Sequence, residues 1–376
     1  MMVTKGVVRS RRKWLWRRWA AIAGWALGAL SAVAAQAEVP LPSVALRPAL
    51  LVPSPSHVMM LGGTRAGSRL VAVGLHGVIL LSDDNGTTWR QAPSPTSVAL
   101  TGAAFADPKN GWIIGHLGIV LHTVDGGETW VRQLDGTTAA NLAFAAAEQA
   151  AAGPGDPKAL QANLKNAQQM VLDGPDKPFL AIETTDARHA LIVGAYGIAF
   201  ATSDAGAHWL PALDRFDDGA AWHIYAMTET GATRYAAGEQ GLFLRSSSGG
   251  PYRAVTMPAQ LSIFGLMTTK AGRVIAYGLD GLFECSDDQG DHWTVLKTGI
   301  ANSFSSALAL PDGRLLLASQ VGQLLMSTDD GTSLHLLNQM SPQPVAGLIL
   351  AADGSIITLG TSGALRLTLD KTSGKS

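Results

Sequence analysis

The chain has 376 residues, of which 47% are hydrophobic and 15% are charged, and its formal net charge is -1. This length is ample for one large domain or two ordinary ones. Seven of the 28 Lys and Arg residues, and none of the 29 Asp and Glu residues, lie in residues 1–37. Residues 38–376 therefore carry 21 basic and 29 acidic residues, a net charge of -8. A mildly acidic body gives no basis for a nucleic-acid partner.

Residues 1–37 are predicted to be an export leader. Basic residues crowd 9–18, an apolar run covers 20–34, and Ala35-Gln36-Ala37 is a small-x-small cleavage site. The apolar run is shorter than the ~20 residues of a membrane span, so no span is expected once the leader is removed. SRRKWLW, residues 10–16, resembles a twin-arginine signal, with the ordinary secretory route and an uncleaved anchor as alternatives.

A Gly-x-x-Gly turn with an apolar stretch on each side recurs along the body, as in VAVGLHGVILL (71–81) and WIIGHLGIVLH (112–122). In the sixth copy Ser319 replaces the first Gly. The second Gly stands at 77, 118, 197, 241, 281, 322 and 363, at intervals of 41, 79, 44, 40, 41 and 41 residues. A period near 40 residues with short strands is typical of propeller blades. We therefore predict an all-β, seven-bladed β-propeller of four-stranded blades over residues 38–370.

The second unit shows the expected blade. Residues 98–106 form the inner strand, 111–115 the second strand and 119–123 the third, with His116-Leu117 as a two-residue hairpin tip. Trp130 opens the outer strand, WVRQL. Each strand is short and roughly alternating, as a packed sheet requires.

A second motif, Ser/Thr-x-Asp-x-Gly-x-x-Trp, follows the third strand of most units. The hydroxyl and carboxylate can accept backbone N–H groups of the turn, the Gly can take a positive φ, and the Trp can cover the flank of its blade. The fourth unit departs from the motif, with Ser248 in place of Asp, and the sixth ends on Leu334. Because one active site does not need copies around a ring, we expect a structural role for these residues: Ser82, Asp84, Gly86, Trp89, Thr123, Asp125, Gly127, Trp130, Thr202, Asp204, Gly206, Trp209, Ser286, Asp288, Gly290, Trp293, Ser327, Asp329 and Gly331.

The interval of 79 residues contains an insertion at 137–177 between units two and three. Two Ala-rich or polar segments separated by GPGDP predict a helical hairpin. The connection between blades emerges on the same face as the Gly-x-x-Gly tips, so the hairpin is expected to overhang that face. Loops on a rigid scaffold tend to carry function. The candidate partner-binding rim is therefore His76, His116, Tyr196, Gln240, Asp280 and Gln320.

The seventh unit supplies only three strands before a polar tail at 371–376. Its open edge would be a liability. Residues 42–52, PSVALRPALLV, have no partner in the first unit. We predict that this segment forms the outer strand of blade seven and closes the ring.

No catalytic, cofactor or metal site is predicted. The nine His residues show no close pair at ligand spacing with carboxylates, and Cys285 is expected to be a buried apolar residue. A sialidase-like glycoside hydrolase remains an alternative, because those enzymes also carry such repeats. However, no Arg cluster and no matching Tyr/Glu pair is evident for Tyr225 or Tyr235. An accessory role in an envelope transport complex is another alternative.

Residues 100–133 resemble the repeat of the photosystem II stability/assembly factor family, exported seven-bladed propellers built from Asp-box (BNR-like) repeats. The resemblance extends over residues 41–370. It implies a non-enzymatic assembly factor that holds membrane-protein subunits on the periplasmic side, or in the thylakoid lumen of an oxygenic host. We expect the chain to be a monomer. The insertion and the acidic body depart from the family pattern, so no docking residue is transferred.

Overall fold

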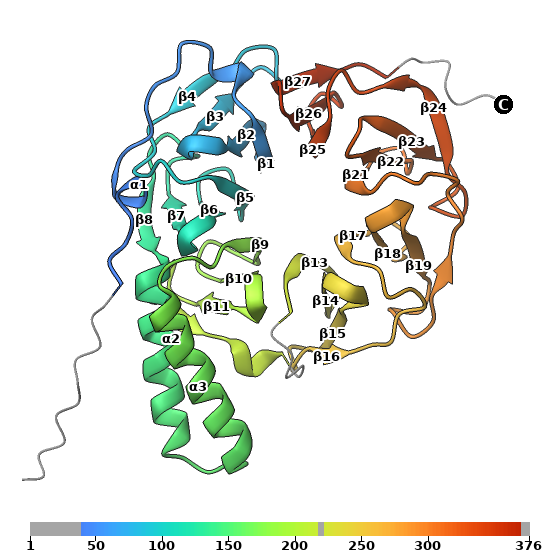
Figure 1. Ribbon diagram of the computed structural model, residues 1–376. Coiled ribbons are helices and arrows are strands. Elements are labelled where there is room, and N and C mark those ends of the chain that lie inside the picture. The colour runs from blue at the N-terminus through green and yellow to red at the C-terminus, as the bar shows by residue number, and fades with distance from the viewer. Residues whose placement is uncertain (1–38, 217–221, 370–376) are drawn as a thin grey trace, which may run out of the picture. The chain divides into compact units, whose positions relative to one another are not determined.

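Seven antiparallel sheets stand around a common axis in the computed structural model, which describes residues 39–216 and 222–369 (Figure 1). In each sheet the strands follow one another in chain order, so one sequence unit makes one blade. Six of these sheets have four strands and one has three. The predicted leader and the polar tail lie outside the described residues.

The first three blades have the following strands. Blade one consists of β1 (Met60–Ala66), β2 (Arg69–Gly74), β3 (Ile79–Ser82) and β4 (Arg90–Ala92). Blade two consists of β5 (Leu100–Phe105), β6 (Gly111–Gly115), β7 (Val120–Thr123) and β8 (Val131–Leu134). Blade three consists of β9 (Phe179–Thr184), β10 (Ala190–Gly194), β11 (Ala199–Thr202) and β12 (Leu210–Pro211).

The remaining blades repeat this plan. Blade four consists of β13 (Ile224–Thr230), β14 (Thr233–Gly238), β15 (Phe243–Ser247) and β16 (Arg253–Ala254). Blade five consists of β17 (Ile263–Thr268), β18 (Val274–Gly278), β19 (Phe283–Ser286) and β20 (Thr294–Val295). Blade six consists of β21 (Phe304–Ala309), β22 (Leu315–Ser319), β23 (Gln323–Ser327) and β24 (His335–Met340). Blade seven consists of β25 (Val345–Leu350), β26 (Ile356–Gly360) and β27 (Gly363–Leu367).

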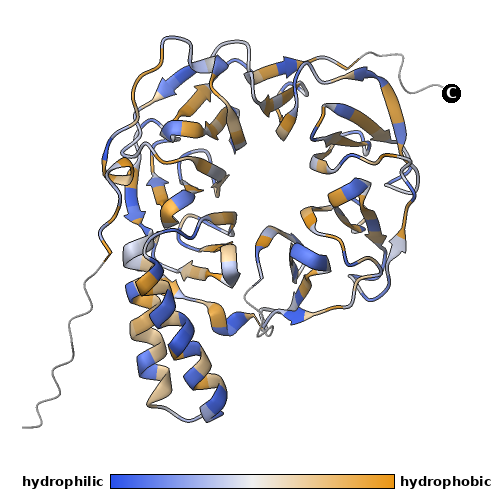
Figure 2. Ribbon diagram, in the orientation of Figure 1, coloured by the Kyte–Doolittle hydropathy of each residue, from blue (hydrophilic) through white to orange (hydrophobic). Residues whose placement is uncertain are grey.

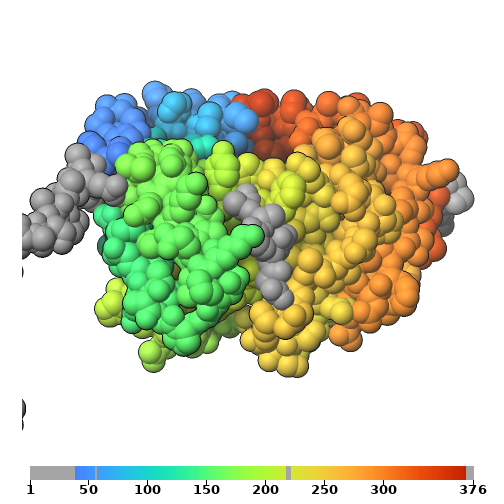
Figure 3. Space-filling view, turned by 60° about the horizontal axis from the view of Figure 1, so that its bottom comes forward, coloured from blue at the N-terminus to red at the C-terminus, as the bar shows by residue number. Residues whose placement is uncertain are grey.

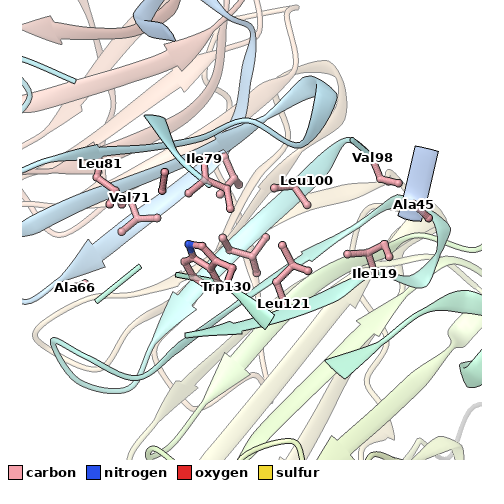
Figure 4. Close-up of a cluster of buried hydrophobic side chains, with 13 residues drawn as sticks. Ala45, Ala66, Val71, Ile79, Leu81, Val98, Leu100, Ile119, Leu121 and Trp130 are labelled. Atoms are coloured by element: carbon pink, nitrogen blue, oxygen red, sulfur yellow. The ribbon is translucent and has the colours of Figure 1, made fainter. Parts of the chain in front are cut away.

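The hydrophobic core is divided into clusters that lie between neighbouring blades. In the cluster between blades one and two, Val71, Ile79 and Leu81 of blade one pack with Leu100 and Leu121 of blade two (Figure 4). Trp130, at the end of the repeated Asp motif, packs in the same cluster. Both faces of each sheet are thus covered by a neighbour, which explains why the second and third strands read as continuous apolar runs (Figure 2).

The same arrangement joins the last blade to the first. Met60, Leu70 and Leu80 of blade one pack with Ile357 and Leu359 of blade seven. Burying apolar surface contributes ~25 cal/mol per Å², so this seam is held by the same force as the other seams. No strand needs to be shared between the first and last blades for their cores to meet.

The prediction that residues 42–52 complete blade seven is wrong. Ser43–Leu46 forms the short helix α1, and the segment then runs beside the connection between blades one and two. There the N–H of Ala49 donates to the Ser94 carbonyl (3.1 Å), and the N–H of Ser97 donates to the Val44 carbonyl (2.9 Å). Prolines at 42, 48, 53 and 55 lack the N–H that a sheet ladder needs. Among the residues from 39 to 369 that the structure describes, β27 is therefore the last strand of blade seven, and the single turn η1 (Pro55–His57) contacts it.

Two helices occupy the long interval between blades two and three: α2 (Gly136–Ala151) and α3 (Pro157–Asp173). Asp135 and Asp156 cap them, accepting the N–H groups of Thr138 and Lys158. The prediction that the hairpin overhangs the tip face is wrong. The hairpin extends outward beside the blades (Figures 1 and 3). One face of α2, through Ala139 and Ala143, packs into the core between blades two and three. No helix in the two described ranges is long and apolar enough to cross a bilayer.

Candidate partner-binding face

The repeated Asp motif folds into the same hydrogen-bonded turn in five blades of the described chain. In blade two the Thr123 hydroxyl donates to Asp125 Oδ1 (2.7 Å) and accepts the N–H of Gly127 (3.0 Å). Asp125 in turn accepts the N–H (3.0 Å) and the hydroxyl (2.6 Å) of Thr129. Equivalent bonds join Ser82 with Asp84, Thr202 with Asp204, Ser286 with Asp288, and Ser327 with Asp329. The oxygens of each carboxylate are therefore committed to its own turn.

These hydrogen bonds keep the motif carboxylates ionised. The Thr88 hydroxyl and N–H lower the pKa of Asp84 to about 2, and the N–H and ring of His208 lower the pKa of Asp204 to about 2. Burial raises the pKa of Asp125, but the bonds from Thr129 outweigh burial and the pKa falls to about 2. A carboxylate that stays ionised and fully engaged is poorly suited to transfer a proton near neutral pH.

Each of these turns is also bonded to the preceding blade. The carbonyl of the residue before the motif Gly accepts a side-chain hydrogen bond from that blade. We call these bonds inter-blade staples. They are Arg366 to Asn85 (3.2 Å), Arg69 to Gly126 (3.1 Å), Gln133 to Ala205 (2.7 Å), Arg245 to Gln289 (3.0 Å) and Arg273 to Asp330 (2.9 Å). The first staple joins blade seven to blade one and so spans the seam that no strand closes.

The opposite face carries the Gly-x-x-Gly tips, which are type I′ hairpin turns in blades one to five. The second x residue and the final Gly both have positive φ, as at His76 (57°) and Gly77 (72°). The N–H of Val78 donates to the Leu75 carbonyl (3.1 Å) and closes the turn. The two central residues are thus the second x and the Gly, one position later than predicted for His116-Leu117.

The predicted rim residues are exposed but occupy two positions in these turns. Four of them hold the left-handed second position: His76, Tyr196, Gln240 and Asp280. His116 and Gln320 hold the position before it. His76 and His116 are therefore not equivalent residues of adjacent blades. Nothing in the described ranges groups three or more potential metal ligands.

A β-bulge at the tip end of every inner strand adds a second set of residues that the sequence did not reveal. The pairing of β13 with β14 skips Tyr225, and the pairing of β17 with β18 skips Phe264. A bulge re-aims the side chain of its extra residue. The bulged residues of the seven blades are Leu61, Thr101, Leu180, Tyr225, Phe264, Ser305 and Ala346, all of them half-buried.

Rings from three blades form a continuous row, which we call the aromatic arc: Tyr196, His223, Tyr225 and Phe264. Successive ring centroids are 4.8, 6.1 and 5.8 Å apart. At its outer end the Lys177 ammonium lies 5.2 Å from the centroid of Tyr196. Three of the four rings come from a tip (Tyr196) or from bulges (Tyr225 and Phe264), so the arc lies on the tip face.

Carboxylates accompany the arc. Glu239, in the tip of blade four, accepts the N–H of His223 (2.9 Å) and pairs with its Nδ1 (3.1 Å). Burial, and then the charge of Glu239, raise the pKa of Tyr225 in the middle of the arc. The Lys177 ammonium pairs with Asp173 (2.9 Å) and Asp176 at the base of the hairpin.

The inner end of the arc opens into a hollow of about 360 Å³ at the mouth of the ring. Its lining comes from blades one, five, six and seven, and none of the lining residues is charged: Met59, Phe264, Ser305, Gln320, Pro344, Val345, Ala346, Gly360 and Thr361. Phe264 belongs to both the arc and the hollow. Of the predicted rim, Tyr196 lies in the arc and Gln320 lines the hollow.

The two tyrosines considered for hydrolase chemistry lack the required neighbours. Tyr235 is buried and its hydroxyl donates to the Gln289 carbonyl (3.2 Å). Tyr225 is influenced by Glu239, whereas Glu229 pairs with Arg234 (3.6 Å). A Tyr/Glu pair gripped by an arginine cluster is therefore not formed by these residues.

The fold and its two faces define a β-propeller whose blades carry the Ser/Thr-x-Asp-x-Gly-x-x-Trp turn on one side and a hollowed tip face on the other. Residues 81–153 match the family model described as "Photosynthesis system II assembly factor YCF48". A 47-residue stretch is 49% identical to photosystem II stability/assembly factor HCF136 of Cyanidioschyzon merolae, covering 12% of this chain and 11% of that protein. Over 193 residues the chain is 21% identical to photosystem II assembly lipoprotein Ycf48 of Synechococcus sp.. That match covers 50% of this chain and 58% of the lipoprotein.

Solved structures show the same fold at low sequence identity. "YCF48 bound to D1 peptide" has a TM-score of 0.62 at 18% identity, with 85% of this chain and 96% of that chain covered. "YCF48 from Cyanidioschyzon merolae" has a TM-score of 0.60 at 14% identity, with 84% and 97% covered. The resemblance predicted from the sequence is confirmed: residues 81–153 match the assembly-factor model, and the chain has the same β-propeller fold as the solved YCF48 structures.

Proposed function

We propose that this chain is a non-enzymatic, exported scaffold that binds a partner protein on its tip face during assembly of a membrane complex. The observation that supports this most directly is the uncharged hollow joined to a row of half-buried and exposed aromatic rings. Concave, partly apolar surfaces with a few polar groups are where proteins bind ligands. The named relatives are assembly factors, and one structural neighbour is bound to a D1 peptide.

The partner class follows from these names. We propose a membrane-protein segment exposed on the periplasmic side, or on the lumenal side if the host is oxygenic. Residues 1–37 act as the leader that brings the chain there, and residues 38–370 act as a monomeric propeller. The Asp motifs serve as structural turns, because their hydrogen bonds stay within the turn and the staples join them to the neighbouring blade.

Site-directed photo-crosslinking in membranes of the source organism tests the proposal. A photoreactive residue at position 361, in place of Thr361, reports on the hollow. A photoreactive residue in place of Ala352 is the matched control, because the two positions lie in exposed turns of blade seven on opposite faces of the propeller. We expect a reproducible membrane-protein adduct from position 361 that is absent from position 352. Equal labelling from both positions, or no adduct from either, would contradict binding at the tip face.

A further inference from the structure

The spacing of the aromatic arc matches that of an extended peptide. Alternate side chains on one face of an extended chain are roughly 6.6 Å apart. The rings of the arc are separated by 4.8 to 6.1 Å. A peptide laid along the arc would thus present one side chain to each successive ring and lead its next residue into the hollow beside Phe264.

The charge of the arc selects among such peptides. An aromatic face attracts a cation within ~6 Å of its centroid, and Tyr196 already holds the Lys177 ammonium at 5.2 Å. Glu239 adds a carboxylate beside His223 and Tyr225, and its turn contacts β17, the strand that provides Phe264. Asp280 adds a second carboxylate at the tip of the same blade as Phe264. Electrostatic attraction of this surface therefore favours a positively charged partner.

The hollow selects a different side chain. None of its lining residues is charged, and Met59, Phe264 and Val345 supply apolar surface. A charged group placed there would lose water without gaining an ionic partner. An apolar side chain placed there would give up no hydrogen bonds to water.

We infer that the tip face binds an extended peptide segment that places a Lys or Arg on the aromatic arc and an apolar residue in the adjoining hollow. This inference rests on the proposed function and specifies the chemistry of the partner. The cation lies against Tyr225 and Phe264, beside the Glu239 carboxylate and on the same face as the Asp280 tip, and the apolar residue follows a few positions along the peptide.

Binding of labelled synthetic peptides to the purified mature protein tests the inference. Three peptides of about twelve residues share the same apolar positions and carry Lys/Arg, Gln or Asp/Glu between them. We expect the basic peptide to bind at least about tenfold more tightly than the acidic one, with the neutral peptide between them. The preference should shrink as salt is raised. Equal affinities, or tighter binding of the acidic peptide, would overturn the inference.

Variants locate the site. Tyr225→Leu removes a ring and should weaken the basic peptide by about threefold to thirtyfold, whereas Tyr225→Phe keeps the ring and should restore binding. Asp280→Asn combined with Glu239→Gln should narrow the basic-over-acidic preference by a similar factor. His76→Asn is the matched control, because it changes the same turn position in blade one. If Tyr225→Leu and Tyr225→Phe behave alike, the ring is not the binding element and the inference is wrong.

The crosslinking experiment separates this inference from the proposed function. Capture of a membrane protein at position 361 together with no charge preference among the peptides would refute the inference and leave the scaffold function standing. Failure of both experiments would refute both.

Discussion

The staple from Arg366 offers a sharp test of how the ring is closed. Within the described residues blade seven has three strands, and it meets blade one and the segment before it through the apolar cluster, through the contact of η1 with β27 and through this side chain. Arg366 Nη1 donates to the Asn85 carbonyl and to the Thr87 hydroxyl, both at 3.2 Å. Replacing Arg366 with Met keeps most of the aliphatic length and removes both bonds, together with the ion pair to Asp353 (2.9 Å) inside blade seven.

The expected cost follows from the exposure of this side chain. A hydrogen bond from a charged group contributes ~1.5–3 kcal/mol when buried, but an exposed ion pair contributes only ~0–1 kcal/mol. The Arg366 side chain is 37% exposed, so we expect a loss of about 1–2 kcal/mol in the free energy of unfolding. Every other seam is also joined by a chain connection, so the opening should concentrate here.

Denaturant unfolding and amide hydrogen exchange measure the two effects. Arg366→Met should increase exchange in β1 and in β25–β27 more than elsewhere. Arg314→Met is the control, because Arg314 pairs with Asp312 (2.7 Å) inside one hairpin of blade six and crosses no seam. Arg69→Met tests a staple at a seam that also has a chain connection. The reasoning fails if Arg366→Met and Arg314→Met lose the same stability and leave exchange in blades one and seven unchanged.

Three further predictions concern stability and reactivity. The pKa values of Asp84, Asp125 and Asp204 lie near 2, below the ~3.9 of an unfolded Asp. The stability that these carboxylates add is therefore present above about pH 4 and is lost as the pH falls towards 2. Denaturant titrations at several pH values should show this decline in the free energy of unfolding. Ala143→Asp places a carboxylate in the core between α2 and blades two and three and should lower the free energy of unfolding by about 2 kcal/mol or more. Ala145→Asp, on the exposed side of α2, should lower it by less than about 0.5 kcal/mol. Equal melting temperatures of the two variants would show that α2 is not packed as described. Burial raises the pKa of the Cys285 thiol, which is 8% exposed, so a thiol reagent should modify the native protein far more slowly than the denatured protein, and equal rates would contradict the burial.

The sequence predicted the blades well because each blade is a local unit. The strands, the Gly-x-x-Gly turn and the Asp motif all lie within about 40 residues, and their periodicity and turn chemistry repeat. The number and order of the sheets therefore follow from the spacing of one glycine. The position of the hairpin tip was misjudged by one residue, because the turn type is decided by two successive positive φ values that a Gly-x-x-Gly pattern does not show.

Closure could not be predicted from the same pattern. An incomplete last blade and an unpaired first segment suggested a shared strand, but the prolines of residues 42–55 deprive that segment of donors, and β27 is left as an edge. A polar contact that bridges the seam is made by the Arg366 side chain, which reaches a carbonyl 281 positions away in sequence. Such a contact has no sequence signature of its own.

The aromatic arc escaped prediction for a related reason. Tyr225 and Phe264 lie at bulges, where side-chain direction departs from simple alternation, and His223 precedes its strand. Lys177 reaches Tyr196 only because the helical hairpin returns the chain to the tip of blade three. The rim was predicted from the hairpin turns alone, and the bulged residues lie outside those turns. Of the predicted rim, therefore, only Tyr196 lies in the arc and only Gln320 lines the hollow.

The staples run in one direction around the ring, each from a side chain to a main-chain oxygen of the next blade. Because the acceptor is backbone, residues as different as Asn85, Gly126, Ala205, Gln289 and Asp330 serve equally at that position. Blades one, two and five each carry both a donor and an acceptor, so a copy of one of these units would arrive with both. Tandem duplication of such a unit can then add a blade to the ring without requiring a new inter-blade contact to evolve first.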